Sequence, residues 1–290
     1  MQFTITGYST ALFSTWYFIE ELRILFDAGE GVASSLMQKS RKIDHVFISH
    51  ADRDHLTGLL QFNQLNARPG FPVIYYPKDC GSFPALKDFT TKFDPHVAGT
   101  VWNPITPENE IRIKDDLFIR VIHNGHVPTK DGIKSLSYKV IQSKMKLKPE
   151  LTKLPGDEIK RIITEQGKES THTEIQTNLL SYSGDTPVED LTRWEQSKIL
   201  IHEATFLRDE EEKINPHGNK HSYLEEVMEM VSGANIEQLI LGHFSSRYAP
   251  ELIDRRILEL CNQYAINIPV FRVLPGTVAN DILKTRPINS

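Results

Sequence analysis

The chain has 290 residues, of which 39% are hydrophobic and 24% charged, and its 16 glycines and 16 prolines are scattered, which excludes a disordered, collagenous or low-complexity chain. With a net charge of −5, the protein as a whole does not attract nucleic acid electrostatically, although a local basic patch could still bind it. The two cysteines, Cys80 and Cys261, are too few for a disulfide framework or a four-cysteine zinc site, so we interpret them as packed thiols in a reducing compartment.

The N-terminal residues 1–10 contain no basic segment of the kind that begins a signal peptide. No apolar run along the chain approaches the roughly 18 residues that a membrane helix requires. We therefore expect a cytoplasmic protein without a membrane partner.

Short strands that end in polar residues dominate the first half of the chain. Strand patterns occur around residues 3–5 and at residues 23–26, 45–48, 73–76, 118–122 and 136–141, and a helical period covers residues 56–65. The strand at 23–26 is followed by DAGEG, the strand at 45–48 by SHADRDH, and the strand at 118–122 by HNGH. Residues 81–107 show no regular pattern.

The second half repeats this organisation. Strands are predicted at residues 179–183, 199–201, 238–241 and 270–274, and helices at residues 157–165, 191–196, 222–232 and 251–264. Ser222 and Glu225 have the spacing of a capping box that would begin the third of these helices. Strands and helices alternate in both halves, which predicts an α/β protein with two sheets packed face to face and helices outside.

Four possible metal ligands, His50, Asp52, Asp54 and His55, lie within six residues directly after a predicted strand. A divalent metal requires imidazole nitrogens and carboxylate oxygens held on a stiff support, which a tight loop at a strand end supplies. Any one of these residues alone would more often be a solvated turn residue or a helix cap. The four together predict a metal site.

Three further candidates, His126, Asp185 and His243, also follow predicted strands, so they can converge on the same end of the sandwich. Seven ligands suit two metal ions roughly 3.5–4 Å apart, an arrangement that hydrolyses phosphodiester and acyl bonds. Asp185 is the natural bridge, because a carboxylate has one oxygen for each ion. Taken singly, each residue could equally be a hydrogen-bonding loop residue.

The motifs that contain these residues resemble those of a known family. Residues 49–58 (SHADRDHLTG) resemble the His-x-His-x-Asp-His motif of the metallo-β-lactamase-fold hydrolases. Five further segments resemble, in family order, ribonuclease Z, the tRNA 3′-processing endonuclease: residues 26–31 (FDAGEG), 182–186 (YSGDT), 202–206 (HEATF), 220–222 (KHS) and 243–248 (HFSSRY). Six motifs in order are a specific signal. The resemblance implies an α/β fold of the four-layer αββα type, as a single domain over residues 1–290.

The resemblance also implies two divalent metal ions, with zinc as the first expectation. One ion would take His50, Asp52, His126 and Asp185, and the other Asp54, His55, Asp185 and His243. His123 is an alternative to His126, but His126 lies closest to the Val127-Pro128 pair that follows this ligand in the family pattern.

Asp52 departs from the family, because it stands where the family has its second histidine. A carboxylate adds negative charge and a harder donor, which favours manganese or iron over zinc or lowers the occupancy of the site. Some di-iron members of the superfamily also carry a carboxylate here. Decay of the site is the alternative interpretation, and we disfavour it because every other ligand position is filled.

By the family pattern, Asp54 would orient the attacking water, and His221, held by Glu203, would protonate the leaving oxygen. Ser245, Ser246 and Arg247 would bind the substrate phosphate, although Arg247 could equally be a plain surface charge. His202 is interpreted as a buried, hydrogen-bonded histidine.

Residues 144–170 occupy the sequence position at which ribonuclease Z has its tRNA-binding arm. Here the segment has seven basic and five acidic residues, and we interpret it as a reduced or altered arm. Lys144, Lys146 and Lys148 alternate along the segment and could contact successive phosphates of an RNA backbone. An exposed strand edge also carries lysines to prevent aggregation, and we slightly favour this second interpretation.

Three hypotheses for function result. The first is a ribonuclease Z-like phosphodiesterase acting on pre-tRNA, as a homodimer if it follows the family. The second is a small-molecule phosphodiesterase of the same fold, for example for a cyclic nucleotide, which the pI of about 6.1 and the reduced arm favour. The third is a non-catalytic binding protein that retains the fold. Steeply salt-dependent tRNA binding would support the first hypothesis.

Overall fold

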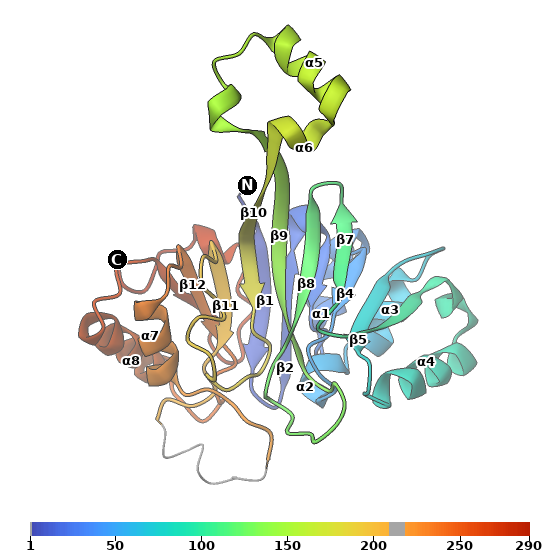
Figure 1. Ribbon diagram of the computed structural model, residues 1–290. Helices are drawn as coiled ribbons and strands as arrows, with labels where there is room; N and C mark the ends of the chain where they lie inside the picture. Colours follow the sequence, from blue (N-terminus) through green and yellow to red (C-terminus); the bar gives the residue numbers. More distant parts are fainter. Residues whose placement is uncertain (1, 209–217) are drawn as a thin grey trace.

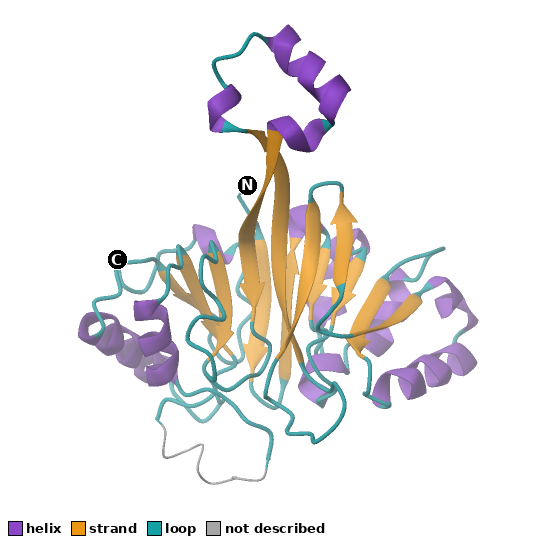
Figure 2. Ribbon diagram, in the orientation of Figure 1, coloured by secondary structure: helices purple, strands orange, loops and turns teal. Residues whose placement is uncertain are grey.

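The computed structural model describes residues 2–208 and 218–290, and its strands form two sheets with helices on both outer faces (Figures 1 and 2). The first sheet has the order β1-β2-β3-β4-β5-β6. Its strands are β1 (Ile5–Thr10), β2 (Ser14–Ile19), β3 (Ile24–Phe26), β4 (His45–Phe47), β5 (Val73–Pro77) and β6 (Val101–Ile105). The first three strands are antiparallel, and β3 to β6 are parallel.

The second sheet has the order β13-β12-β11-β10-β9-β8-β7. Its strands are β7 (Glu110–Lys114), β8 (Leu117–His123), β9 (Leu136–Leu147), β10 (His172–Tyr182), β11 (Ile199–Glu203), β12 (Gln238–Gly242) and β13 (Val270–Arg272). β10 to β13 are parallel, and β7 to β10 are antiparallel. The carboxyl ends of β8, β10, β11 and β12 consequently lie at one edge of this sheet.

Aromatic and branched side chains from the two sheets form the central core. Phe26 on β3 stacks on Tyr138 of β9 and Tyr182 of β10, with ring centroids 5.9 and 5.0 Å apart. The neighbouring residues of β3 and β4, Leu25 and Val46, point to the opposite face and join an outer core. Strands buried on both faces need apolar side chains at every position, which explains the continuous apolar runs in the sequence.

Helices cover the outer face of each sheet. On the first sheet they are α1 (Val32–Leu36), α2 (Arg53–Leu56), α3 (Leu59–Asn66) and α4 (Ser82–Phe93), and on the second they are α7 (Leu224–Gly233) and α8 (Pro250–Gln263). The layer order is therefore α, β, β, α, and this confirms the fold class predicted from the sequence. No helix in residues 2–208 and 218–290 combines the length and the apolar character needed to cross a bilayer.

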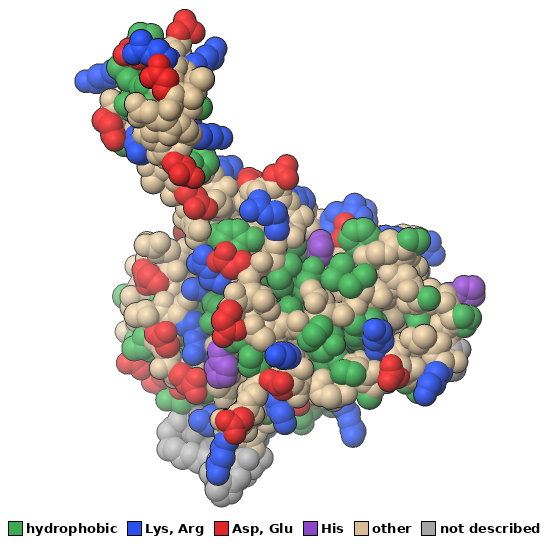
Figure 3. Space-filling model, turned by 45° about the vertical axis from the view of Figure 1, so that its right-hand side comes forward, with side chains coloured by type: hydrophobic (Ala, Val, Ile, Leu, Met, Phe, Trp, Pro, Cys, Tyr) green, Lys and Arg blue, Asp and Glu red, His purple; other side chains and the backbone are tan. Residues whose placement is uncertain are grey.

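β9 and β10 continue beyond their neighbours as a two-stranded arm. β8 pairs with β9 only as far as Gln142, whereas β9 and β10 stay paired to Leu147 and His172. Two helices, α5 (Gly156–Gln166) and α6 (Lys168–Thr171), lie at the tip (Figure 1). The helix predicted at residues 157–165 is confirmed. Basic and acidic side chains are intermixed on the visible face of the arm (Figure 3).

Three sequence predictions differ from the structure. The helix predicted at residues 191–196 is wrong, because Asp190 accepts hydrogen bonds from the N–H and hydroxyl of Thr192 and holds this segment in successive turns. The predicted capping box is displaced by one residue: Glu226 accepts from the N–H of Tyr223, while Ser222 donates to the carbonyl of Thr186. The segment without a regular pattern, residues 81–107, contains α4 and β6.

Candidate metal centre

The polar loops that follow several strands meet at one edge of the sandwich. His50 follows β4, His126 follows β8, Asp185 follows β10 and His243 follows β12. An isolated bridge between His50 and Ser135 joins the first sheet to the beginning of β9. The topology alone therefore brings residues from both halves of the chain together.

Each of the four histidines predicted as metal ligands is anchored through its Nδ1 atom. Nδ1 of His50 lies 2.9 Å from Oγ of Ser49, and Nδ1 of His126 lies 2.6 Å from the carbonyl oxygen of Lys220. A ring N–H that donates to these partners leaves Nε2 as the atom available for coordination.

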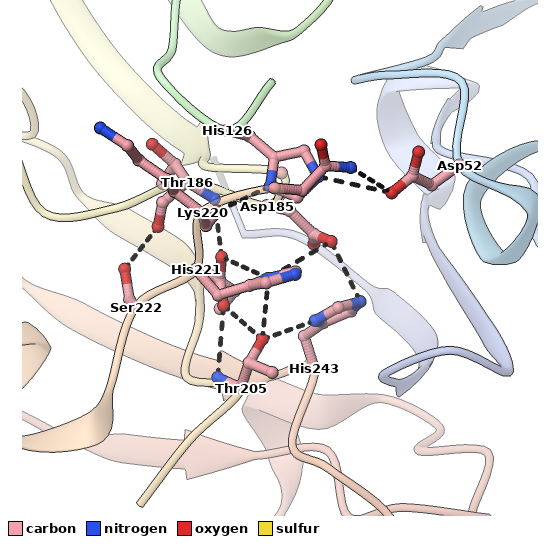
Figure 4. Close-up of polar contacts among 12 residues, drawn as sticks. Asp52, His126, Asp185, Thr186, Thr205, Lys220, His221, Ser222 and His243 are labelled. Atoms are coloured by element: carbon pink, nitrogen blue, oxygen red, sulfur yellow. Dashed lines mark hydrogen bonds and ion pairs between the residues drawn. The ribbon is translucent and has the colours of Figure 1, made fainter. Parts of the chain in front are cut away.

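The other two histidines follow the same pattern. Nδ1 of His55 lies 2.8 Å from Oδ2 of Asp27, and Nδ1 of His243 lies 2.8 Å from Oγ1 of Thr205. All four Nε2 atoms are thus free to face the centre. Figure 4 shows His243 turned toward Asp185 and His126 turned toward Asp52.

The carboxylate of Asp185 lies between these Nε2 atoms. Its Oδ2 is 3.2 Å from Nε2 of His55, 3.3 Å from Nε2 of His243 and 3.7 Å from Nε2 of His50. Two donors held 2.0–2.2 Å from one ion at a tetrahedral angle lie about 3.4 Å apart. The spacing of these atoms therefore suits shared coordination of metal.

Asp52 and Asp54 complete the ring of donors. Oδ2 of Asp52 lies 3.6 Å from Nε2 of His126 and 3.7 Å from Nε2 of His50. Oδ2 of Asp54 lies 3.3 Å from Nε2 of His243 and 3.6 Å from Nε2 of His55. The donors thus divide into two overlapping groups on either side of Asp185.

Two of the buried imidazoles at this edge have an Nε2 atom that the described chain leaves without a hydrogen-bond partner. Nε2 of His50 and Nε2 of His126 are buried and have no hydrogen-bond partner among residues 2–208 and 218–290. A buried polar atom without a partner costs roughly 1–3 kcal/mol. Coordination of a cation removes this cost, so the residues present fit a divalent metal.

The electrostatics of the centre favour ionised carboxylates. Burial opposes a charge on Asp185, but His243 and His55 outweigh it and hold the pKa of Asp185 well below its usual range. Burial, together with His55 and His126, lowers the pKa of His50 well below its ordinary value. Burial also lowers the pKa of His55, but Asp185 and Asp27 reverse this and raise it well above its ordinary value.

A second cluster of polar side chains adjoins the metal ligands. Nδ1 of His221 lies 3.2 Å from Oε1 of Glu203 and 3.7 Å from Oδ2 of Asp185. Burial lowers the pKa of His221, but the Glu203 carboxylate outweighs it and raises this pKa to about 9. The hydroxyl of Thr205 donates to Oε2 of Glu203 and lies between His221 and His243 (Figure 4).

The segment that carries His221 also covers Asp52. Nδ2 of Asn219 donates to Oδ2 of Asp52 across 2.8 Å, and the N–H of Lys220 donates to the carbonyl of His126 across 2.8 Å. Asp52 is therefore held from both sides, by His126 and by Asn219, although its side chain is 45% exposed.

The structure brings together all seven residues predicted as metal ligands, and His221 and Glu203 beside them. The alternative ligand His123 lies exposed at the end of β8. His202 is buried, with Nδ1 2.7 Å from the carbonyl oxygen of Glu203, while its Nε2 has no hydrogen-bond partner in the described chain.

The predicted phosphate-binding residues lie in the loop after His243. Nε of Arg247 donates to Oγ of Ser245 across 3.0 Å, and the guanidinium lies over the rings of Phe206 and Tyr248. Ser246 and Arg247 are exposed, and Ser245 is partly buried.

Sequence reasoning missed Asp27, Thr205 and Asn219, which hold the ligands in place. Asp27 lies in the segment DAGEG after a predicted strand, but its contact with His55 spans 28 residues, and the contact of Thr205 with His243 spans 38. A local sequence pattern cannot predict contacts between residues this far apart along the chain. The position of a polar residue directly after a strand, which singled out the ligands, was the available signal for Asp27.

Comparison with known proteins places the chain among metal-dependent hydrolases. The family model described as a β-lactamase superfamily domain matches residues 22–244. The chain is 29% identical to ribonuclease Z of Methanocaldococcus jannaschii, with 91% of this chain and 87% of the relative covered. It is 28% identical to tRNase Z TRZ1 of Arabidopsis thaliana, with 89% and 91% covered.

Solved structures show the same fold. The metallo-β-lactamase-fold protein YhfI from Bacillus subtilis is similar with a TM-score of 0.65 at 16% identity, covering 96% of this chain and all of that one. The short form of human tRNase Z is similar with a TM-score of 0.56 at 18% identity, covering 84% and 93%.

Proposed function

The chain belongs to the β-lactamase superfamily, and on that premise we propose that it is a metal-dependent phosphodiester hydrolase of the ribonuclease Z type that cuts the 3′ end of pre-tRNA. The observation that carries this proposal is the convergence of four imidazoles, all anchored through Nδ1, around Asp185. The relatives that are similar over about nine-tenths of this chain are named for tRNA cleavage, which supports the choice of substrate.

We propose that two divalent ions occupy the centre. His50, Asp52, His126 and Asp185 would hold one, and Asp54, His55, Asp185 and His243 the other. When bound, such ions acidify water and neutralise charge on a phosphate. Zinc is the first expectation, and manganese or iron is the alternative, because Asp52 replaces a nitrogen donor with an oxygen donor.

The residues around the metal ligands have separate tasks in this proposal. Asp54 accepts a hydrogen bond from the backbone of Leu12, which fixes its carboxylate so that it can orient the attacking water. His221, held by Glu203, lies beside Asp185 and would give its proton to the leaving oxygen. Without this proton, an alkoxide would have to leave unaided.

Phosphate binding falls to the loop after His243. Ser245, Ser246 and Arg247 would contact the substrate phosphate, since a guanidinium can donate to two phosphate oxygens. The stacking of Arg247 on Phe206 and Tyr248 restricts its side chain and would lower the entropy lost on binding.

The deciding experiment is metal analysis coupled to parallel assays on pre-tRNA and on a chromogenic phosphodiester. Metal-dependent cleavage of pre-tRNA at its 3′ side supports the proposal. Turnover of the small diester without affinity for tRNA would replace it with a small-molecule phosphodiesterase. A protein that binds no metal after reconstitution would contradict the hydrolase altogether.

A further inference from the structure

The turn between β1 and β2 places two exposed apolar side chains beside the metal centre. Leu12 is 89% exposed and Phe13 is 59% exposed. The N–H of Leu12 donates to Oδ2 of Asp54 across 3.0 Å, and the N–H of Ala11 donates to the carbonyl of Phe244 across 3.3 Å. The turn is therefore fastened to the loop that carries Asp54 and His55 and to the loop that carries His243.

The direction of the strands explains this position. β1 is antiparallel to β2, and β2 is antiparallel to β3, so β1 ends at the same edge of the sheet as β3. The loop after β4, which carries His50 and His55, lies at this edge too. Any substrate phosphate at the centre consequently lies next to the turn.

Packing among the described residues does not account for the side chain of Leu12. Leu12 has a φ of +70°, in the left-handed region that glycine and asparagine adopt far more easily in hairpin turns. Its side chain is almost fully exposed, so it gains little from burial within the chain. A contact outside the chain would explain why large apolar residues occupy this turn.

We propose that Leu12 and Phe13 form the binding surface for the nucleobase adjacent to the scissile phosphate. This inference rests on the proposed function. Every base presents a flat apolar face, and an exposed phenyl ring on a turn that contacts the loops of the centre offers a stacking platform for it. A protein partner fits less well, because it would cover the centre that the phosphate must reach.

The test combines protein variants with altered RNA. Leu12→Gly and Phe13→Ala, singly and together, are compared with the wild type on a pre-tRNA and on the same RNA made abasic at either nucleotide flanking the cut. KM for cleavage and Kd in the presence of chelator are both measured. For the double variant we expect KM on the intact RNA to rise about tenfold. On the RNA that is abasic at the contacted position, the variant and the wild type should have equal KM.

Met37→Gly is the matched control. Met37 is 70% exposed and has a φ of +49°, so this substitution also removes an exposed apolar side chain at a positive φ. The backbone of Met37 is hydrogen-bonded to Ala33 and Ser40 and not to a metal ligand. Its KM should equal that of the wild type. Leu12→Gly should not lower Tm, because glycine suits the backbone, and Leu12→Asn provides a second variant that tolerates the same φ.

Two failures are distinguishable. If the wild type cleaves the RNA but the double variant keeps the wild-type KM, the inference is overturned and the proposed function stands. If the wild type binds the RNA without cleaving any phosphodiester, the proposed function fails, and the Kd values decide the inference: loss of affinity that disappears on abasic RNA supports it, and equal affinity overturns it.

Discussion

His55 and Asp27 form a buried pair in which Nδ1 of the imidazole donates to Oδ2 of the carboxylate across 2.8 Å. The other oxygen of Asp27 accepts from the N–H of Ser49 across 2.7 Å, so the carboxylate is fixed by the strand end that carries His50. This pair directs Nε2 of His55 toward Asp185. Asp27 therefore positions a ligand without touching the centre itself.

Replacement of Asp27 by asparagine should lower metal affinity roughly 10- to 100-fold, because a partner that orients a ligating histidine contributes that much in comparable sites. The measurement is competition of the apoprotein against a chromophoric chelator. Asp254→Asn is the control, since the carboxylate of Asp254 pairs with Arg272 and not with a histidine. Equal affinity of the Asp27 variant and the wild type would contradict the role assigned to Asp27.

His221→Ala should lower kcat on pre-tRNA by about 10²- to 10⁴-fold while leaving metal content unchanged, because it removes a proton donor and no proposed ligand. His123→Ala is the matched control, since His123 is exposed at the end of β8. Metal content is measured by elemental analysis and kcat under saturating substrate. An undiminished kcat for His221→Ala would exclude this histidine as the acid.

Asp52→His should shift metal preference toward zinc, because it restores a nitrogen donor at this position. The ratio of the Kd for manganese to the Kd for zinc should rise about tenfold relative to the wild type. Asn219→Ala should change the same ratio less, since it only frees the Asp52 carboxylate. An unchanged ratio in Asp52→His would show that Asp52 does not contact the metal.

Removal of metal by a chelator should lower Tm, and its return should restore it. A ligand present at 100 times its Kd stabilises the folded state by about 2.7 kcal/mol, and the metal here would also satisfy the buried Nε2 atoms of His50 and His126. Calorimetry on the wild type and on His243→Ala checks this, and the variant should show a smaller shift. A Tm that is independent of metal in both proteins would speak against binding at this centre.

Gly58→Ala should destabilise the fold by roughly 2–4 kcal/mol, because an added Cβ would lie 2.0 Å from the carbonyl oxygen of Gly29. Gly58 allows the segment after His55 to approach the DAGEG loop this closely. Gly81→Ala is the control, since no described atom beyond its two chain neighbours lies within 4 Å of its Cβ position. Denaturant unfolding gives both values, and equal stability of the two variants would contradict the close packing.

Most of the strands could be predicted, because a strand that is buried on both faces has a continuous apolar run in the sequence, bounded by polar loops. Prediction failed where a long-range contact overrode a local pattern. The helix predicted at residues 56–65 is present as α3, but α3 begins only at Leu59, after Gly58, which lies against Gly29. The Ser222 hydroxyl satisfies the carbonyl of Thr186 instead of capping a helix.

The candidate ligands could be predicted from the sequence because each occurs directly after a strand and because four of them lie within six residues. The residues that hold them could not be predicted in the same way. Thr205 and Asn219 act through partners that are distant along the chain, and their residue types are common in loops. Only the tertiary structure distinguishes them from other polar loop residues.

The central claim is that donors from both halves of the chain bind a pair of cations that support hydrolysis. The most direct measurement is the metal content per chain, with phosphodiester hydrolysis, of the wild type, Asp185→Ala and His243→Ala after reconstitution. The account predicts two metals per wild-type chain, fewer in each variant, and no metal-dependent hydrolysis by either variant. Full metal content and full turnover in Asp185→Ala would contradict it.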